Sequence, residues 1–255
     1  MKLLMLGSGT STGVPRIGED WGECDPKEPR NRRSRVSIIV ESNAGQRILV
    51  DTSPDLRNQL LANGIEKVDA VFWTHDHADH CHGIDDLRVM RYDRSNPLPG
   101  YATTVTGERL KRRFDYIFAG QFGYPTLVEL RDVKDARLVS GFSFDWVEMP
   151  HGPAKSTGFR FESDGRSIGY ATDFSEITDA MVECLEGVDL LVCDCLRMRP
   201  HPTHAHYEMA LEFGGRTNAR AMVLTHLDKS MDYRTVADLT PSNVTVGYDG
   251  LEIEL

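Results

Sequence analysis

The sequence predicts an α/β protein made of two mixed β-sheets packed together, with helices on their outer faces. Short runs with β-propensity recur along the chain, and helix-like stretches separate several of them. Some strands follow one another in hairpin-like groups and others alternate with helices in β-α-β units, which excludes a single parallel sheet. We expect one domain, 1–255, because the sequence has no repeat, low-complexity tract or linker rich in Gly, Ser or Pro.

Each element follows from its local pattern of apolar residues. The first strand is expected at Lys2–Leu6, where Gly7 to Thr10 end the apolar run. Later strands are predicted at Val36–Glu41, Arg47–Asp51, Val68–Thr74, Thr103–Thr106, Phe144–Met149, Gly158–Glu162, Ser167–Ala171, Leu190–Cys195, Ala221–Thr225 and Thr245–Gly247. Helices are predicted at Pro54–Ala62, Ile84–Tyr92, Gly107–Phe118, Ile177–Leu185, His206–Phe213 and Asp232–Leu239.

The composition is that of an ordinary globular protein, with 40% hydrophobic and 27% charged residues. A formal net charge of −10 repels polyphosphates on average, which disfavours a partner such as nucleic acid. No apolar run approaches the roughly 18–20 residues of a transmembrane helix, and the apolar start is too short for a signal peptide. The five cysteines are scattered and odd in number, so we expect a reducing, cytoplasmic location.

One segment, Val71–Gly83, carries the main functional signal, because an apolar strand runs directly into histidines and aspartates. The side chains of His75 and His77 point the same way if the chain stays extended there. Asp79 and His80 then lie beyond a turn, near the start of the next helix, and can face that pair. Neutral imidazoles suit Zn, Mn or Fe, and a carboxylate adds the negative charge that a divalent ion prefers. The segment therefore predicts a metal site.

Three further candidate ligands, His151, Asp173 and His226, lie elsewhere in the chain. Each follows an apolar strand, and the ends of strands are where ligand sites on mixed α/β sheets tend to lie. A lone histidine in a loop is more often an ordinary surface residue. Together with the first cluster, however, the three indicate a metal site shared by several strand ends.

The order His-x-His-x-Asp-His, followed by a later His, an Asp and a final His, resembles the metallo-β-lactamase superfamily. Three other stretches are similar to its PhnP branch, the phosphoribosyl 1,2-cyclic phosphate phosphodiesterases: GSGTSTGVP (7–15), LVDTSPDL (49–56) and VGYDGLEI (246–253). This branch is itself related to the tRNA 3′-processing nucleases. The resemblance covers almost the whole chain and implies a four-layer αββα sandwich with a binuclear metal site at one edge.

The resemblance also implies a ligand set and a mechanism. One divalent ion, zinc or manganese, is assigned His75, His77 and His151, a second is assigned Asp79, His80 and His226, and Asp173 bridges the two. Metal coordination lowers the pKa of bound water to near 7, so such ions would supply a nucleophile at neutral pH. Asp79 and Asp173 supply the negative charge that keeps the metal pair bound.

Two positions outside this ligand set receive supporting roles. Asp51 ends a strand where the superfamily keeps a carboxylate that contacts a metal ligand rather than the metal. We expect it to orient a ligand imidazole; the alternative is a solvated turn residue. The departing alkoxide needs a proton, and a positioned histidine is the usual donor. By resemblance His204 is that general acid, with His201 and His206 as competing candidates and an exposed, purely structural loop as the alternative.

A basic cluster, Arg30–Arg35, stands out in an acidic chain. Arg32, Arg33 and Arg35 are candidate phosphate contacts, because a guanidinium matches phosphate oxygens in shape and charge. Charge runs are usually solvated faces, and that interpretation stays open.

One departure from the PhnP pattern concerns a structural zinc site that is separate from the binuclear site. Members of the branch with a structural zinc carry a cysteine cluster after the Gly-Val-Pro turn and a histidine three residues past the last ligand. Here that region holds only Cys24, and Lys229 replaces the histidine. We therefore expect no structural zinc and expect packing to order the segment Trp21–Pro26.

The leading functional hypothesis is hydrolysis of a small anionic phosphodiester, such as a phosphoribosyl cyclic phosphate. The alternatives are a tRNA 3′-processing ribonuclease, which the net acidity disfavours, and a non-hydrolytic relative in a cofactor pathway, for which missing ligands would be expected. The resemblance further implies a homodimer. The sequence does not distinguish zinc from manganese.

Overall fold

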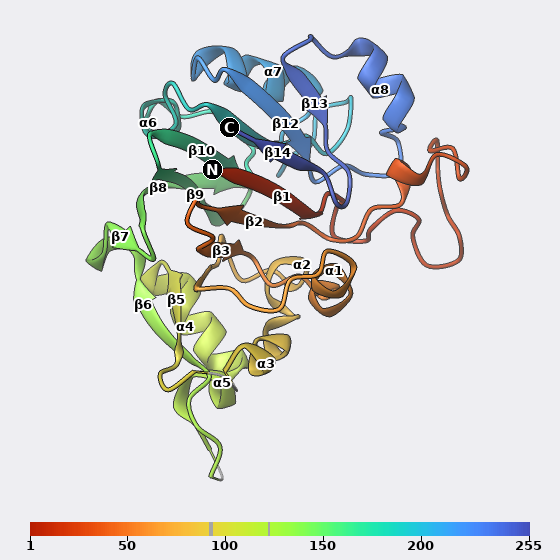
Figure 1. Ribbon diagram of the computed structural model, residues 1–255. Helices are drawn as coiled ribbons and strands as arrows, with labels where there is room; N and C mark the ends of the chain where they lie inside the picture. The colour runs from red at the N-terminus through yellow and green to blue at the C-terminus, as the bar shows by residue number, and fades with distance from the viewer. Residues whose placement is uncertain (92–93, 122) are drawn as a thin grey trace.

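The computed structural model describes residues 1–91, 94–121 and 123–255, and these residues form two seven-stranded sheets (Figure 1). The first sheet contains β1 (Lys2–Gly7), β2 (Ser37–Glu41), β3 (Arg47–Val50), β4 (Ala70–Phe72), β5 (Leu98–Ala102), β6 (Val128–Asp132) and β14 (Glu252–Glu254). The second contains β7 (Leu138–Val139), β8 (Phe142–His151), β9 (Ala154–Ser163), β10 (Arg166–Ala171), β11 (Leu190–Asp194), β12 (Ala221–Thr225) and β13 (Val244–Val246).

Both sheets are mixed, as the sequence predicts. The strand order is β14-β1-β2-β3-β4-β5-β6 in the first sheet and β13-β12-β11-β10-β9-β8-β7 in the second. Strands β3 to β6 run parallel to one another. Beyond β3 the sheet continues with β2, β1 and β14, each antiparallel to the strand before it. Strands β10 to β13 are likewise parallel, and β7, β8 and β9 extend them as antiparallel neighbours.

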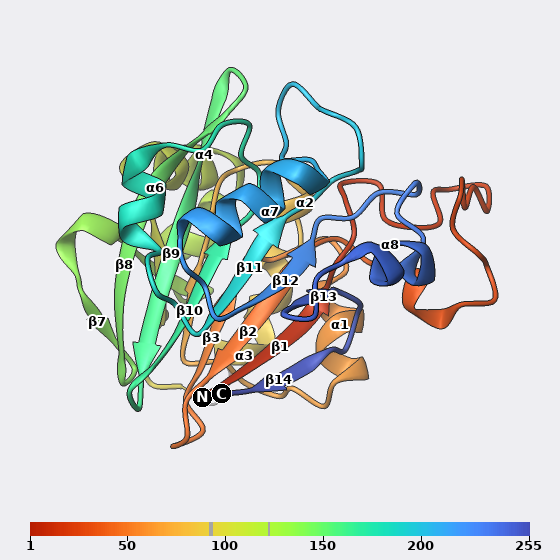
Figure 2. The same ribbon diagram turned by 90° about the horizontal axis from the view of Figure 1, so that it is seen from above.

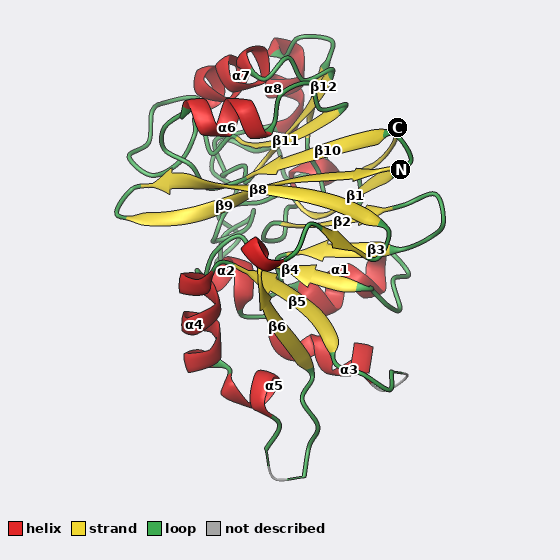
Figure 3. Cartoon of the chain, turned by 90° about the vertical axis from the view of Figure 1, so that its left-hand side faces the viewer, coloured by secondary structure: helices red, strands yellow, loops and turns green. Residues whose placement is uncertain are grey.

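Helices cover the outer face of each sheet (Figure 3). The first sheet carries α1 (Leu56–Ala62), α2 (Ala78–Cys81), α3 (Leu87–Arg91), α4 (Thr104–Arg113) and α5 (Asp115–Ala119), and the second carries α6 (Asp179–Cys184), α7 (Tyr207–Arg216) and α8 (Tyr233–Leu239). Short 3-10 turns lie at Pro29–Asn31, Ile84–Asp86 and Val133–Asp135. The predicted four-layer αββα arrangement is therefore confirmed.

The inner faces of the two sheets meet in an aromatic core. The ring of Phe72 stacks on Tyr101 at 4.7 Å and lies edge-on to Phe144, Phe159 and Phe161 at 5.0–5.2 Å. Such stacked and edge-to-face pairs are the arrangements that aromatic quadrupoles favour. Each sheet also packs on its own helices through a further apolar cluster. A strand such as β11 is thus buried on both faces, which explains its continuous apolar sequence.

The structure corrects several predicted element boundaries. Thr103–Thr106 is not a strand, because the Thr103 side chain accepts a hydrogen bond from the Thr106 N–H and caps α4. The run of β-branched residues favoured a strand, but a threonine hydroxyl also suits the start of a helix. The strand lies just before it, in β5, where Pro99 obscured the pattern. Strands β6, β7 and β14 were not predicted, and Tyr92 of the predicted helix Ile84–Tyr92 lies outside the described residues.

The chain termini lie together, at the end of the sheets opposite the loops that follow β11 and β12 (Figure 2). The Leu255 N–H donates to the Met1 carbonyl at 3.0 Å, which fixes this pairing. Among the described residues, no helix has the length and apolar character needed to cross a membrane.

The end of α2 packs very tightly against the segment after β3. Gly83 donates its N–H to the Thr52 carbonyl at 2.9 Å, and a Cβ added to Gly83 would lie 1.9 Å from the Ser53 carbonyl oxygen. Only glycine therefore allows this backbone approach, which holds the histidine-rich segment on the sheet.

We expect Gly83→Ala to destabilise the fold by about 1–3 kcal/mol, because the two backbone segments must move apart. Denaturant unfolding measures the change. Gly215→Ala in α7 is the matched control, since nothing lies within 4 Å of its added methyl group, and it should be neutral or stabilising. Equal effects of the two substitutions would contradict the packing argument.

Candidate metal centre

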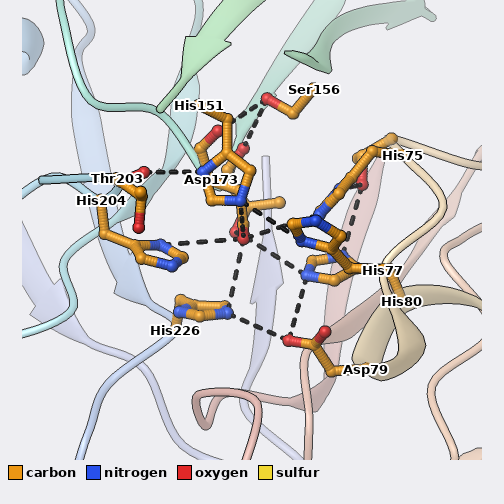
Figure 4. Close-up of polar contacts among 12 residues, drawn as sticks. His75, His77, Asp79, His80, His151, Ser156, Asp173, Thr203, His204 and His226 are labelled. Carbon is orange, nitrogen blue, oxygen red and sulfur yellow. Dashed lines mark hydrogen bonds and ion pairs between the residues drawn. The ribbon is translucent and has the colours of Figure 1, made fainter. Parts of the chain in front are cut away.

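The predicted metal-ligand residues converge at one edge of the sandwich, where strand ends of both sheets meet (Figure 4). His75 follows β4, and His80 lies in the short helix α2, so both come from the first sheet's half of the chain. His151 ends β8, Asp173 follows β10 and His226 follows β12, all in the second half. The cluster therefore forms only when the two halves pack together.

Three of these strand ends share an unusual backbone conformation. Asp51, Asp173 and His226 have φ angles of 63°, 61° and 60°. This left-handed region is uncommon for residues other than glycine, although Asp and His enter it more readily than most. Strained backbone of this kind concentrates at functional sites. Here the left-handed conformation turns the chain just after β3, β10 and β12, at the residue that carries the polar side chain.

Asp173 lies at the centre of the cluster, with its two carboxylate oxygens facing different histidines. Its Oδ2 is 3.7 Å from His75 Nε2 and 3.5 Å from His151 Nε2. Its Oδ1 is 3.3 Å from His80 Nε2 and 3.5 Å from His226 Nε2. One carboxylate thus lies between two groups of imidazole nitrogens, with one histidine from each half of the chain on either side.

The remaining predicted ligands complete these two groups. His77 Nδ1 lies 3.3 Å from His151 Nε2, and one ligand atom from each of His75, His77, His151 and Asp173 falls within 4.8 Å of the others. His77 is exposed, whereas the rest of this group is buried. On the other side, Asp79 Oδ2 is 3.5 Å from the Nε2 atoms of both His80 and His226.

The donor atoms fit divalent metal ions. The Nε2 atoms of His75, His80 and His226 are buried and have no hydrogen-bond partner among the described residues. Buried polar atoms are almost always satisfied, so such a group needs an explanation. Imidazole nitrogens and carboxylate oxygens together form the donor set that suits Zn and Mn.

Burial and neighbouring charges set the protonation of the cluster. The pKa of His75 lies well below its ordinary value, because burial and the nearby His80 both disfavour a second positive charge. Burial works to raise the pKa of Asp173, but His226 and His80 hold it well below the usual range. A neutral imidazole and an ionised carboxylate are the forms that bind a metal.

The second nitrogens of two candidate ligands are held by the protein. His80 Nδ1 lies 2.7 Å from Asp51 Oδ2, and Asp51 also accepts from the Thr74 N–H at 2.8 Å. His151 Nδ1 lies 2.7 Å from the Thr203 carbonyl. A carboxylate or carbonyl can only accept, so each Nδ1 carries a proton and Nε2 is the atom available to a metal. Burial works to lower the pKa of His80, but Asp173 and Asp79 raise it well above its ordinary value, so a metal ion that binds His80 displaces a proton. The contact expected of Asp51 is thus present.

The three histidines considered as proton donors lie in different surroundings. His204 Nδ1 is 3.2 Å from Asp194 Oδ2 and 3.7 Å from Asp173 Oδ2. His201 lies further out, with its ring centroid 5.2 Å from that of His204. His206 is at the start of α7, 4.0 Å from Glu208 rather than in the cluster.

Asp194 is a site residue that sequence reasoning missed. Its Oδ2 accepts from His204 Nδ1 and the Ala205 N–H at 3.2 Å and from the Phe174 N–H at 3.3 Å. Burial works to lower the pKa of His204, but the Asp194 carboxylate raises it to about 9. The available signal was an acidic residue at the end of the apolar strand Leu190–Cys195.

The structure places the candidate arginines away from the histidines. Arg33 is buried, with its guanidinium near Cys24 Sγ and the Asp228 carbonyl. Arg35 pairs with Asp55 at 3.0 Å, and Arg32 lies over the Trp21 ring. No contact described for these side chains joins them to the metal-ligand candidates, and their role as phosphate contacts stays a prediction.

Two other arginines lie beside the cluster and were not predicted. Arg109 and Arg113 of α4 approach the Asp76 carboxylate at 3.0 and 2.8 Å. Asp76 stands between His75 and His77 in the sequence, and both arginines are about half exposed. Two guanidinium groups face this single carboxylate, which leaves positive charge next to the exposed edge of the site.

The segment Trp21–Pro26 is ordered by polar contacts as well as by packing. Cys24 is buried, and Asp232 accepts from the Asp25 N–H at 3.1 Å and from Asn31 Nδ2 at 2.7 Å. Lys229, in the place of the zinc-binding histidine, pairs with Asp20 at 2.5 Å. The expectation of packing alone was therefore incomplete.

Comparison with known proteins agrees with the resemblance inferred from sequence. A family model described as the β-lactamase superfamily domain matches residues 46–227. The crystal structure of a diphosphatase from the PhnP family is similar over 100% of this chain and 96% of its own, with 37% identity and a TM-score of 0.89. Zinc-bound PqqB from Methylobacterium extorquens, 20% identical, shares the fold over 100% of both chains, with a TM-score of 0.81.

A further relative is a longer protein. The octanoyltransferase of Porphyromonas gingivalis is 34% identical over 258 residues, which cover 99% of this chain and 51% of that protein. The chain thus spans about half the length of this relative.

We expect Asp51→Asn to weaken metal binding about 10–100-fold, because the amide cannot accept from His80 as strongly as a carboxylate. Chelator competition with the metal-loaded protein measures the affinity. Asp69→Asn, at a partly exposed site that pairs with Arg94, is the control and should leave the affinity unchanged. Unaltered metal binding by Asp51→Asn would remove the orienting role.

Proposed function

This chain belongs to the β-lactamase superfamily, and we propose that it is a two-metal phosphohydrolase acting on a small phosphodiester, including the cyclic phosphodiester of a phosphoribosyl group. The observation that supports this most directly is the Asp173 carboxylate, whose two oxygens face separate groups of histidine nitrogens. A carboxylate in that position suits a pair of cations rather than a single one. Phosphodiester hydrolysis is a reaction that paired divalent ions serve well.

In this proposal the ions are zinc or manganese. Their ligands are His75, His77 and His151 on one side and Asp79, His80 and His226 on the other, with Asp173 shared. Bound there, the ions would supply Lewis acidity toward phosphoryl oxygens and make water a better nucleophile at neutral pH. Asp51 and the Thr203 carbonyl keep two of the imidazoles in the metal-binding tautomer.

His204 is the proposed proton donor to the leaving alkoxide. Its Nδ1 is held by Asp194, and it lies beside Asp173 without belonging to the proposed ligand set. A hydrogen bond from Nδ1 to a carboxylate fixes the ring and leaves Nε2 for proton transfer. The three histidines of this loop are therefore not equivalent, and the contacts of His204 support it as the proton donor over His201 and His206.

The substrate is proposed to be a small anion. The chain is strongly acidic overall, with a net charge of −10, so a long polyanion is repelled outside the site. Arg109 and Arg113 concentrate positive charge beside the exposed His77. This arrangement disfavours a tRNA 3′-processing ribonuclease, and the full set of converging donors disfavours a non-hydrolytic cofactor-pathway protein.

A diphosphate is the second candidate substrate class. It is favoured by the similarity to the PhnP-family diphosphatase, which extends over the whole chain at 37% identity. The same ligands would serve both substrates, because each presents a phosphoryl group with anionic oxygens. The single domain 1–255, a cytoplasmic location and a homodimer stay predictions.

A screen of phosphodiesters and diphosphates on the metal-loaded protein tests the proposed activity. We expect turnover of bis-p-nitrophenyl phosphate that is lost on chelation, restored by zinc or manganese, and abolished by His75→Ala. His82→Ala, at an exposed position just after α2, is the control and should keep activity. Absence of turnover on every phosphate ester and diphosphate would refute the proposal.

The leaving group distinguishes a proton donor from a residue that only supports the site. We expect His204→Gln to lower kcat on a 2′,3′-cyclic nucleotide about 100-fold or more, because its alkoxide needs a proton. The loss on bis-p-nitrophenyl phosphate should be much smaller, since p-nitrophenolate leaves without one. His206→Gln is the control. Equal losses on both substrates would count against the role of His204.

A further inference from the structure

Four buried polar atoms beneath the metal centre have no hydrogen-bond partner among the described residues. They are the Tyr170 hydroxyl, Asp194 Oδ1, Thr225 Oγ1 and His226 Nδ1. The side chains of all four residues are 0–1% exposed. Unpartnered polar atoms in the interior cost free energy, and native proteins satisfy them through protein groups or ordered water. Four of them on residues of the neighbouring strands β10, β11 and β12, or directly after them, suggest a common partner.

The strand register places these residues on neighbouring positions of one sheet. Tyr170 of β10 pairs with Val192 of β11, which in turn pairs with Val223 of β12. All three side chains belong to the core between the sheets. Two residues further along, Asp194 and Thr225 are themselves a registered pair.

Because side chains alternate along a strand, Asp194 and Thr225 face the same side as Tyr170 and form the next row toward the metal centre. A tyrosine side chain is long enough to reach from its own row into the next. The electrostatic surroundings of the Tyr170 hydroxyl agree, since they include Asp51, His80, Asp173 and Asp194. The hydroxyl therefore lies on the inner side of the cluster.

The distance between His226 Nδ1 and Asp194 Oδ1 suits a bridging water molecule. His226 Nδ1 and Asp194 Oδ1 are 3.9 Å apart, which is too far for a direct hydrogen bond. A polar pair separated by more than about 3.5 Å is a place where a water molecule commonly bridges. Within the described part of the chain, His226 Nδ1 has no protein acceptor of the kind that serves His80 and His151.

We propose that a buried water molecule binds between Tyr170, Asp194, Thr225 and His226. Through this water, Tyr170 acts as a positioning residue of the metal centre. The water accepts from His226 Nδ1–H and from the Tyr170 hydroxyl, and donates to Asp194 Oδ1 and to Thr225 Oγ1. All four atoms are then satisfied, within the two to four hydrogen bonds that a buried water makes.

The consequence is a coupling between two functional histidines. A proton fixed on His226 Nδ1 leaves its Nε2 free as a ligand, and the same water holds the Asp194 carboxylate whose other oxygen binds His204. Tyr170 thus supports both the metal ligand and the proton donor without touching either. The inference rests on the metal-centre part of the proposed function.

Tyr170→Phe gives opposite results with and without this water. A hydroxyl that truly lacks a partner would make the substitution neutral or stabilising, because only an unsatisfied polar atom is removed. With the water, the metal-free variant should unfold at lower denaturant concentration, and its metal affinity should fall about tenfold or more. Denaturant unfolding and chelator competition measure the two effects.

Tyr207→Phe is the matched control, since its hydroxyl donates to the Leu239 carbonyl at 2.9 Å between α7 and α8. It should change stability but not metal affinity. A high-resolution crystal structure of the metal-loaded protein should show the water with these four contacts. A direct bond between His226 and Asp194 in that crystal, or a Tyr170→Phe protein with undiminished stability and metal affinity, would overturn the proposal.

These readouts use no substrate. A protein that binds metal and contains the water but hydrolyses no phosphate ester or diphosphate would refute the proposed activity while leaving this inference standing. Failure of the two ideas can therefore be told apart.

Discussion

The site depends on the interaction of one carboxylate, that of Asp173, with imidazoles from both halves of the chain. Each of its oxygens faces one histidine from the first half and one from the second: His75 and His151 at Oδ2, His80 and His226 at Oδ1. Any cation bound there would join the two sheets at their edge. The charge of such a cation would therefore stabilise the packing of one sheet on the other.

Around this carboxylate, the protein orients its histidines with groups that can only accept hydrogen bonds. Asp51 holds His80, the Thr203 carbonyl holds His151, and Asp194 holds His204. Each contact fixes which ring nitrogen carries the proton, and a mobile imidazole would lose much of its value as a ligand or acid. Asp51 directly follows β3 and Asp194 ends β11, so a rigid ladder of backbone hydrogen bonds determines their positions.

The aromatic core explains why these distances can be maintained. Phe72 lies one residue before Trp73 and three before His75, and its ring is locked among Tyr101, Phe144 and Phe159. A close-packed interior transmits small displacements rather than absorbing them. The strand that delivers the first histidine is therefore anchored against strands of the opposite sheet, next to the site that it serves.

The sequence by itself determined the fold class and the candidate ligands, because both depend on local patterns: apolar periodicity along strands, and histidines or aspartates directly after them. It did not reveal Asp194, whose significance depends on a histidine ten residues away in a loop, or Arg109, which reaches Asp76 from another helix. It also did not reveal that Arg33, one of the predicted phosphate contacts, is buried. Only the tertiary structure decided these points, because pairing between distant segments is set by strand register and sheet packing, which leave no mark on any single stretch of sequence.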